Sequence, residues 1–332
     1  MEKVYDNFSI LPWHHPQWQR LQTGRTEGRL PHALLINGPA GLGKSRFARC
    51  FAASLLCTGS GEAGMPCGNC KSCLLLKAGN HPDLFLVTPE EPGKGIRIDA
   101  IREVTGREVL TAQYGGYKVI IIEPADALNV AASNSLLKTL EEPVSRTLMV
   151  LVSSIPGKLQ ATIRSRCQRV DIRVPERAQA RDWLEAQGGA GDPDLLLDLA
   201  SGAPLLALEL ADPELLQLRK TMLGEFVSVL EGKQNPVDIA ARWHKQELKR
   251  VLIWISGWII DILRLKSTTE TSTLLNPDQR RSLQAIGNTL EFNGLYEVLD
   301  EVYEAIGNLG GQLNTQMLLE GLLLRLRACY SD

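Results

Sequence analysis

A glycine-rich turn constrains the fold of this chain more than any other feature. Residues 38–45 read Gly-Pro-Ala-Gly-Leu-Gly-Lys-Ser, which fits the pattern G-x-x-x-x-G-K-[ST]. The apolar run of residues 34–36 precedes the turn, and Phe47, Phe51 and Leu55 follow it at helical spacing. A strand, a glycine turn and a helix in this order predict a phosphate-binding loop within an α/β fold.

The residue types in the turn suit phosphate chemistry. Gly38, Gly41 and Gly43 let backbone N–H groups turn toward phosphate oxygens, and the helix N-terminus adds partial positive charge. Lys44 supplies a full positive charge, and the Ser45 hydroxyl is a ligand for Mg²⁺. We therefore assign these five residues as a candidate site for ATP and Mg²⁺. The alternative is a plain turn between a strand and a helix.

Four cysteines follow the predicted helix within a short segment. Cys57 is separated by nine residues from Cys67, and Cys70 and Cys73 follow at intervals of three. This spacing allows four sulfur atoms to meet at one point and close a tetrahedron around Zn²⁺. The pattern predicts a structural zinc module over residues 57–73, because a site filled by four protein ligands leaves no open position for catalysis.

Two other interpretations of the cysteines remain. An iron–sulfur run of this kind has a further cysteine after three residues and then a proline, and residues 74–80 contain neither. A redox-active C-x-x-C pair is also compatible with the spacing. Four cysteines within 17 residues favour the closed metal site.

The remaining hydrophobic pattern divides the chain. Residues 83–87, 118–123 and 147–152 are apolar runs typical of buried parallel strands, and helical segments alternate with them. Strand patterns stop after residue 172, and one long helix is predicted over residues 235–268. The predicted domains are listed in chain order: an α/β domain with helices on both faces of a parallel sheet over 1–173, a small helical domain over 174–212, and an all-helical domain over 213–332.

The end of the third predicted strand bears on ATP hydrolysis. A hydrolysing enzyme of this type has Asp-Glu there, one carboxylate near Mg²⁺ and the next to polarise the attacking water. This chain has Glu123-Pro124. Glu123 retains a carboxylate, but proline has no acid–base group, so a general base is missing at that position.

Two further motifs carry a family resemblance. Residues 134–143 read Asn-Ser-Leu-Leu-Lys-Thr-Leu-Glu-Glu-Pro, and residues 165–167 read Ser-Arg-Cys. Together with the phosphate loop and the cysteines, they resemble the bacterial clamp-loader family of AAA+ proteins along the whole chain. The resemblance implies an AAA+ domain with a zinc-binding insertion, a helical lid domain and a C-terminal collar domain that joins subunits. It also implies a place in the holoenzyme of DNA polymerase III, a DNA-directed DNA polymerase.

The resemblance implies specific partners and a specific role. The partners would be motor subunits and a delta subunit in a heteropentamer, the sliding clamp, and primed DNA reached through the complex. Arg166 would be an arginine finger that reaches the ATP of a neighbouring subunit, although spacing alone favours a solvated basic turn. Ser153 or Ser154 would match a γ-phosphate sensor.

Departures from the motor-subunit pattern point to a stator. Motor subunits have Asp-Glu where this chain has Glu123-Pro124, and an arginine in the lid where residues 201–205 have none. The resemblance therefore implies a degenerate ATPase with an intact phosphate loop, which holds nucleotide without turnover. An active motor subunit of the same complex is the alternative.

Composition excludes some other classes of function. The 332 residues carry a net charge of -2, whereas a protein that grips nucleic acid alone shows a basic excess. This argues against a stand-alone zinc-dependent DNA-binding protein, which is the second alternative. Residues 1–6 lack the layout of a secretory signal, and the longest apolar run, residues 251–260, is too short for a membrane span. We expect a cytoplasmic protein.

Overall fold

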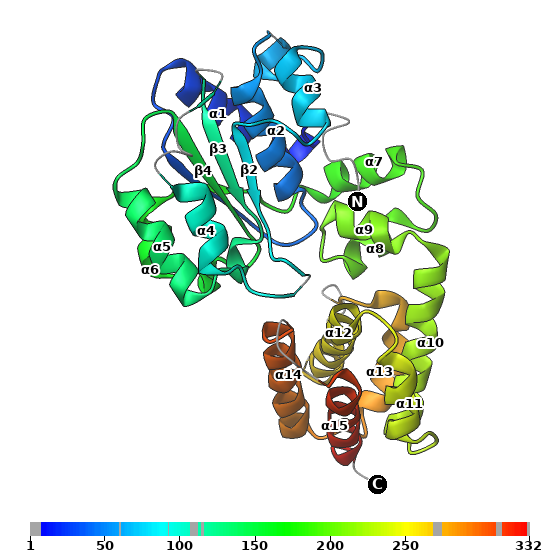
Figure 1. Ribbon diagram of the computed structural model, residues 1–332. Coiled ribbons are helices and arrows are strands. Elements are labelled where there is room, and N and C mark those ends of the chain that lie inside the picture. The colour runs from blue at the N-terminus through cyan, green and yellow to red at the C-terminus, as the bar shows by residue number, and fades with distance from the viewer. Residues whose placement is uncertain are drawn as a thin grey trace. The chain divides into compact units, whose positions relative to one another are not determined.

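The chain forms two compact units, residues 1–179 and residues 180–332. The computed structural model describes residues 8–59, 61–91, 93–106, 112–113, 116–267, 274–309 and 314–330. Figure 1 labels the elements along the chain. None of the described helices combines the length and the hydropathy that a membrane span requires.

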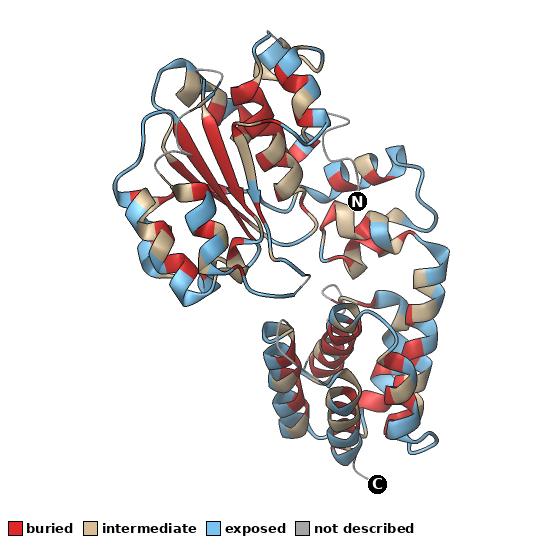
Figure 2. Cartoon of the chain, viewed as in Figure 1, coloured by how far each residue is buried: buried red, intermediate tan, exposed pale blue. Residues whose placement is uncertain are grey.

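A parallel five-stranded sheet forms the centre of the first unit, in the order β2-β3-β4-β1-β5. The strands are β1 (Ala33–Asn37), β2 (Leu84–Val87), β3 (Lys118–Ile122), β4 (Thr147–Ser153) and β5 (Gln168–Asp171). Every residue of β1, β3 and β4 is buried, which Figure 2 shows in red. Burial on both faces explains why these strands read as continuous apolar runs. The predicted parallel α/β sheet is confirmed.

The described residues of the first unit also form helical elements. They are η1 (Pro12–His14), α1 (His15–Thr26), α2 (Lys44–Leu56), η2 (Glu62–Gly64), α3 (Lys71–Lys77), α4 (Ile98–Thr105), η3 (Ala125–Ala127), α5 (Val130–Glu141), η4 (Pro156–Lys158) and α6 (Ala161–Arg166). Helices α4, α5 and α6 contribute Ile101, Leu136 and Ile163 to one core cluster with residues of the sheet. Trp18 of α1 packs edge-on against Phe47 and Phe51 of α2.

Helix α2 connects two features that the sequence singles out. It begins at Lys44, directly after the glycine turn, and Cys57 caps its C-terminal end. Phe47 and Phe51 on this helix are fully buried. The helix is therefore held in the core of the unit, with the phosphate loop at one end and the first cysteine at the other.

The regular elements of the second unit are helices, and its described residues contain no β-strand. Its helices are α7 (Arg177–Ala186, which begins just before the boundary), α8 (Pro193–Leu199), α9 (Pro204–Leu210), α10 (Pro213–Leu230), α11 (Pro236–Trp243), α12 (Leu248–Ser267), η5 (Pro277–Gln279), α13 (Arg280–Gly287), α14 (Phe292–Gly307) and α15 (Thr315–Ala328). Side chains of Asp212, Asn235 and Asn314 cap α10, α11 and α15. The predicted all-helical C-terminal region is confirmed, and the predicted boundaries after residues 173 and 212 stay predictions.

The single helix predicted over residues 235–268 is wrong, because α11 ends at Trp243 and α12 begins at Leu248. The rings of Trp243 and Trp258 lie 6.4 Å apart, and Phe226 packs at 5.2 Å from Trp258. In one straight helix, Trp243 and Trp258 would be separated by about 22 Å along the axis. The turn between the helices brings these aromatic side chains into one core, and Thr268 lies outside the described residues.

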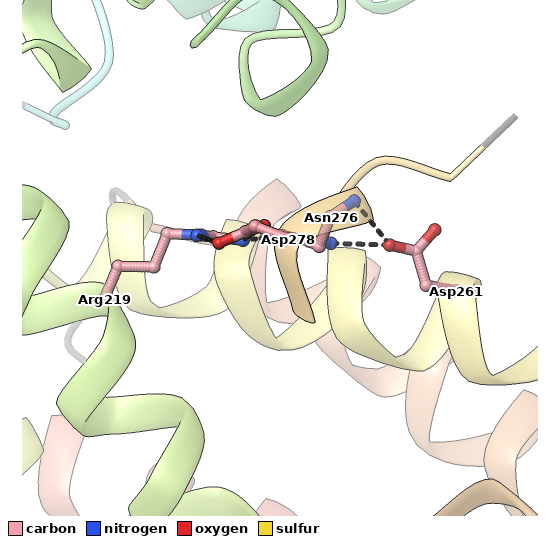
Figure 3. Close-up of polar contacts among 4 residues, drawn as sticks. All are labelled: Arg219, Asp261, Asn276 and Asp278. Atoms are coloured by element: carbon pink, nitrogen blue, oxygen red, sulfur yellow. Dashed lines mark hydrogen bonds and ion pairs between the residues drawn. The ribbon is translucent and has the colours of Figure 1, made fainter. Parts of the chain in front are cut away.

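A buried polar network ties three segments of the second unit together (Figure 3). Arg219 on α10 donates to both carboxylate oxygens of Asp278, at 2.9 and 3.1 Å, and to Asn276 Oδ1 at 2.6 Å. Asp261 on α12 accepts from the backbone N–H groups of Leu275 and Asn276 and from Asn276 Nδ2, at 2.7–2.9 Å. Arg219 and Asp261 are almost fully buried, yet each has several charge-assisted hydrogen bonds.

Candidate functional site

The glycines of the phosphate loop adopt conformations that other residues disfavour. Gly41 and Gly43 both have φ near 74°. A Cβ atom on Gly38 would lie 2.1 Å from the carbonyl oxygen of Ile172, so a side chain there would collide with the backbone after β5. The turn therefore requires glycine at these positions. It follows the carboxyl end of β1, the edge where ligands bind in parallel sheets.

Lys44 lies over the loop that it follows. Its Nζ donates to the carbonyl oxygen of Pro39 at 2.6 Å. Burial lowers the pKa of Lys44, and the carboxylates of Asp126 and Glu123 oppose that shift. A phosphate oxygen would be a stronger, charged acceptor for this ammonium than the carbonyl is.

Glu123 follows β3 and is bound on both of its carboxylate oxygens. The Ser45 hydroxyl donates to Oε1, and a guanidinium NH2 of Arg49 lies 3.2 Å from Oε2. Pro124 comes next and begins the turn into η3. The structure therefore brings Lys44, Ser45 and Glu123 together, and it adds Arg49, which the sequence analysis missed. Arg49 lies four residues after Ser45, so helical spacing already placed both on one face of α2.

A second carboxylate near the loop was also missed. Asp126 in η3 accepts from the Ser153 hydroxyl and from the backbone N–H groups of Ser154 and Ile155, at 2.9 and 3.2 Å. Ser153 is thus engaged through its hydroxyl, whereas Ser154 is engaged through its backbone. The choice between these two serines as sensor stays a prediction. No spacing rule connects Asp126 to the end of β4, because their proximity arises from the sheet.

Two aromatic side chains near the N-terminus hold the loop from the other side. Trp13 Nε1 donates to the carbonyl oxygen of Leu42 at 3.0 Å. His14 Nε2 lies 2.8 Å from the same oxygen, and His14 Nδ1 accepts from the backbone N–H of Leu11. This pairing requires a proton on Nε2 and none on Nδ1. Burial lowers the pKa of His14 to about 4, so the ring is neutral at physiological pH.

A cavity of about 410 Å³ lies beside η1, α1 and the end of β5 in the first unit. Its lining comprises Pro12, Trp13, Pro16, Gln17, Arg20, Asp171, Arg173, Val174, Pro175 and Gln179. Asp171 accepts a hydrogen bond from Nδ2 of Asn37 at 2.7 Å, and Asn37 directly precedes the first glycine of the phosphate loop. Ligand pockets of this size are common, and the mixed polar and aromatic lining suits a small polar ligand.

The four predicted cysteines meet at one point. All their sulfur atoms lie within 4.8 Å of one another, and three pairs lie 3.5, 3.8 and 4.0 Å apart. Four sulfurs at about 2.3 Å from a tetrahedral Zn²⁺ would be separated by about 3.8 Å. The cluster of Cys57, Cys67, Cys70 and Cys73 therefore has the dimensions of a structural zinc site.

The surroundings of the cluster act on the four sulfurs in opposite directions. Backbone N–H groups of Cys67, Cys70 and Cys73 donate to the sulfurs of Cys57, Cys67 and Cys70 at 3.3–3.4 Å. Hydrogen bonds from Asn69 and Cys70 lower the pKa of the Cys67 thiol, whereas burial raises the pKa of Cys57 and Cys73. Buried thiolates need a compensating cation, so the donor set fits Zn²⁺.

Arg166 lies at the amino-terminal end of β5, whereas the phosphate loop follows the carboxyl end of the neighbouring strand β1. It ends α6, just before β5, and the start of β5 pairs in parallel with Leu34 at the start of β1. Its guanidinium lies 2.7 Å from Glu141 Oε1 and donates to the carbonyl oxygen of Thr162 at 2.9 Å. The side chain is 35% exposed. The structure therefore separates Arg166 from the phosphate loop of its own chain.

Two family models match most of the chain. Residues 13–176 match the family "DNA polymerase III, delta subunit", and residues 213–328 match "DNA polymerase III, delta subunit, C terminal". The chain is 36% identical to DNA polymerase III subunit delta' of Pseudomonas aeruginosa, over 95% of this chain and 97% of the relative. It is 33% identical to the Escherichia coli subunit of that name, over 95% and 94%.

A more distant likeness covers half of the chain. The tau/gamma subunit of DNA polymerase III from Haemophilus influenzae is 33% identical over 164 residues, which are 49% of this chain and 23% of the relative. The matches to delta' subunits instead extend through both structural units. With a phosphate loop, a four-cysteine insertion and an all-helical C-terminal region in one sequence, the chain belongs to the delta-prime subunits of DNA polymerase III, within the clamp-loader family.

Proposed function

We propose that this subunit is the stator of its clamp loader and the donor of an arginine finger. It holds nucleotide without hydrolysing it and presents Arg166 to ATP bound by the adjacent motor subunit. The complex then loads the sliding clamp onto primed DNA during replication. The observation that carries the proposal is the position of Arg166, before β5 and away from the loop after β1.

The site at the carboxyl end of β3 supports the absence of turnover. Hydrolysis needs a group that positions or polarises water beside the γ-phosphate. Glu123 is bound by Ser45 and Arg49, and Pro124 supplies no acid–base group. Asp126 is bound by three donors at the end of β4. Among the described residues at the ends of β3 and β4, both of these carboxylates are thus already engaged by donors.

The environment of Arg166 supports action in trans. Its guanidinium is anchored by one carboxylate and one carbonyl, and more than a third of the side chain is exposed. A guanidinium presented at a subunit surface neutralises charge that develops on a transferring phosphoryl group. The likeness to a tau/gamma subunit over 164 residues supports motor partners of the same fold, with a delta subunit completing a heteropentamer.

The test replaces Arg166 by alanine in a complex reconstituted with motor and delta subunits. The DNA-stimulated ATPase should fall at least tenfold, because an arginine finger contributes roughly 10³–10⁵ in rate. Assembly, followed by gel filtration, should be unchanged. Arg169→Ala is the matched control, since this neighbouring arginine on β5 is 62% exposed and pairs weakly with Asp171.

Two results would contradict the proposal. One is normal ATPase activity from a fully assembled Arg166→Ala complex. The other is rapid ATP turnover by the isolated subunit that is lost in Lys44→Ala, because this would identify an active motor.

We further propose that the cysteine cluster holds one structural Zn²⁺. Cys57, Cys67, Cys70 and Cys73 would fill all four positions, so the metal would fix the insertion against the end of α2. Metal analysis of the purified subunit should find one zinc per chain, and Cys70→Ser should lower that content. A visible iron–sulfur absorption or an oxidised C-x-x-C disulfide would contradict the assignment.

A further inference from the structure

Arg49 occupies a position beside Glu123 that the chemistry of the phosphate loop does not require. Both Ser45 and Arg49 project from α2 toward the end of β3, one helical turn apart. The Arg49 guanidinium lies 3.2 Å from Glu123 Oε2, and the two side chains are 15% and 17% exposed. The pair is therefore largely shielded from water, which strengthens its electrostatic interaction.

Phosphate loops of this pattern hold Mg²⁺ between the serine or threonine hydroxyl and an acidic residue at a nearby strand end. A serine hydroxyl that donates to that carboxylate leaves one carboxylate oxygen for the metal. Here Arg49 is bound to that remaining oxygen, Oε2. A divalent cation beside Glu123 would also lie close to the guanidinium, and like charges at short range repel. The residues present therefore do not fit Mg²⁺ as the motif implies.

The hydrogen bonding of Arg49 argues against a purely structural role. Among the described residues, its hydrogen-bonding and ion-pair partner is Glu123, and its buried Nε has no partner. A guanidinium has five donors in a fixed fork, so Glu123 engages only part of the capacity of Arg49. Structural buried arginines are normally saturated by hydrogen bonds.

We propose that Arg49 replaces Mg²⁺ in this subunit, so that the phosphate loop binds nucleoside di- and triphosphates without requiring a divalent cation. The guanidinium neutralises Glu123 and keeps positive charge at the metal position, while Lys44 faces the phosphates. This inference rests on the proposed retention of nucleotide in the loop. It adds that bound nucleotide depends on a cation built into the chain.

The test measures ADP and ATP affinity of the full-length subunit by calorimetry, in Mg²⁺ and in excess EDTA. For the unmodified chain, the two dissociation constants should agree within about threefold. Arg49→Met should bind more weakly in EDTA than in Mg²⁺ by roughly tenfold or more, because Glu123 then becomes available to the metal. Arg49→Lys should restore agreement, since it keeps the charge.

Arg46→Met is the matched control on the same helix. Arg46 donates to the backbone oxygen of Ser9 at 2.8 Å and does not contact Glu123, so its loss should leave the ratio of the two constants unchanged. Circular dichroism of each variant checks that it folds. If Arg49→Met does not fold, the comparison of the unmodified chain in Mg²⁺ and in EDTA still tests whether nucleotide binding requires a divalent cation.

The outcomes separate this inference from the proposed function. Binding by the unmodified chain that weakens more than about tenfold in EDTA would overturn the inference and leave the stator proposal intact. Metal-independent binding by Arg49→Met would also overturn it, because Arg49 would then not be the replacement. No nucleotide binding in either condition would overturn the inference and the proposed retention of nucleotide together, while the Arg166 test would still stand.

Discussion

Each unit of the molecule contains an arginine that is largely shielded from water, and the two differ in how completely they are bound. Arg219 in the helical unit makes three hydrogen bonds to Asp278 and Asn276, and its side chain is 3% exposed. Arg49 in the α/β unit makes one contact with Glu123 at 3.2 Å and leaves its Nε without a partner among the described residues.

The difference separates a structural role from a functional one. Arg219 and Asp261 join α10 and α12 to the segment around Asn276, which has little regular structure of its own. Arg49 joins α2 to the end of β3, which the sheet and its core already hold in place. Replacing Arg219, whose hydrogen bonds are complete, should lower the stability of its unit. Replacing Arg49, which has one partner among the described residues, should instead change the binding of nucleotide.

The largest expected effect is that of Arg219→Met. We expect the free energy of unfolding of the helical unit to fall by about 3–5 kcal/mol, because Asp278 and Asn276 lose a buried, charge-assisted partner. Urea denaturation followed by tryptophan fluorescence measures this, since Trp243 and Trp258 lie in the same unit. A loss below about 1 kcal/mol would mean that the network contributes little to stability.

Arg242→Met is the control for this measurement. Arg242 contacts Glu225 at 2.8 Å in the same unit, but its side chain is 51% exposed. A pair with an exposed arginine contributes about 0–1 kcal/mol, so this variant should remain close to the unmodified chain.

Acid should destabilise the α/β unit by a free energy slightly smaller than the one that Arg219→Met costs the helical unit. Burial lowers the pKa of His14 to about 4, below the 6.5 of an unfolded histidine. The neutral ring therefore stabilises the α/β unit above pH 6.5, and this contribution is lost as the pH falls from about 6.5 to about 4. Its size is about 3 kcal/mol.

Hydrogen exchange at a series of pH values would localise this loss. Amides of the phosphate loop and α1 should lose protection on acidification before amides of α12 and α15. His14→Gln keeps an amide that hydrogen-bonds but does not titrate, so its stability should depend less on pH over the same range. An identical pH profile in the two proteins would exclude His14 as the cause.

The smallest expected effect is that of Arg49→Met on stability. We expect a loss of about 1 kcal/mol or less, because Arg49 makes a single contact of 3.2 Å and the cost of burying its Nε, which has no partner among the described residues, offsets part of that contact. Glu123 also keeps its bond to Ser45. The same urea series measures it. A loss as large as that of Arg219→Met would abolish the distinction between the two arginines.

Local patterns predicted the parts of the fold that depend on neighbours in sequence. The strand, glycine turn and helix around Lys44 follow from a run of adjacent residues, and the cysteine cluster follows from fixed spacing. The break between α11 and α12 could not be predicted from local patterns. It allows the rings of Trp243 and Trp258, which are distant in sequence, to pack together. The partners of Arg219 lie 57 and 59 residues away in sequence, and no periodicity connects them.

The residues of the candidate site also divide into those that local patterns predict and those whose partners are distant in sequence. Ser45 and Glu123 were predicted from their motifs, and Arg49 could have been found from its helical spacing to Ser45. Asp126 and His14 carried no such signal, because each acquires its role from a backbone group of a distant segment. Pairings of this kind depend on the packing of the sheet, which a single sequence does not specify.

The end of α2 has one further consequence. Because Cys57 caps that helix, one of the four thiols belongs to the central fold and only three belong to the segment that follows. A peptide that contained residues 58–73 alone would carry an incomplete ligand set. The insertion therefore does not carry the complete ligand set by itself, and a metal bound by all four thiols would also require the end of α2 to be in place.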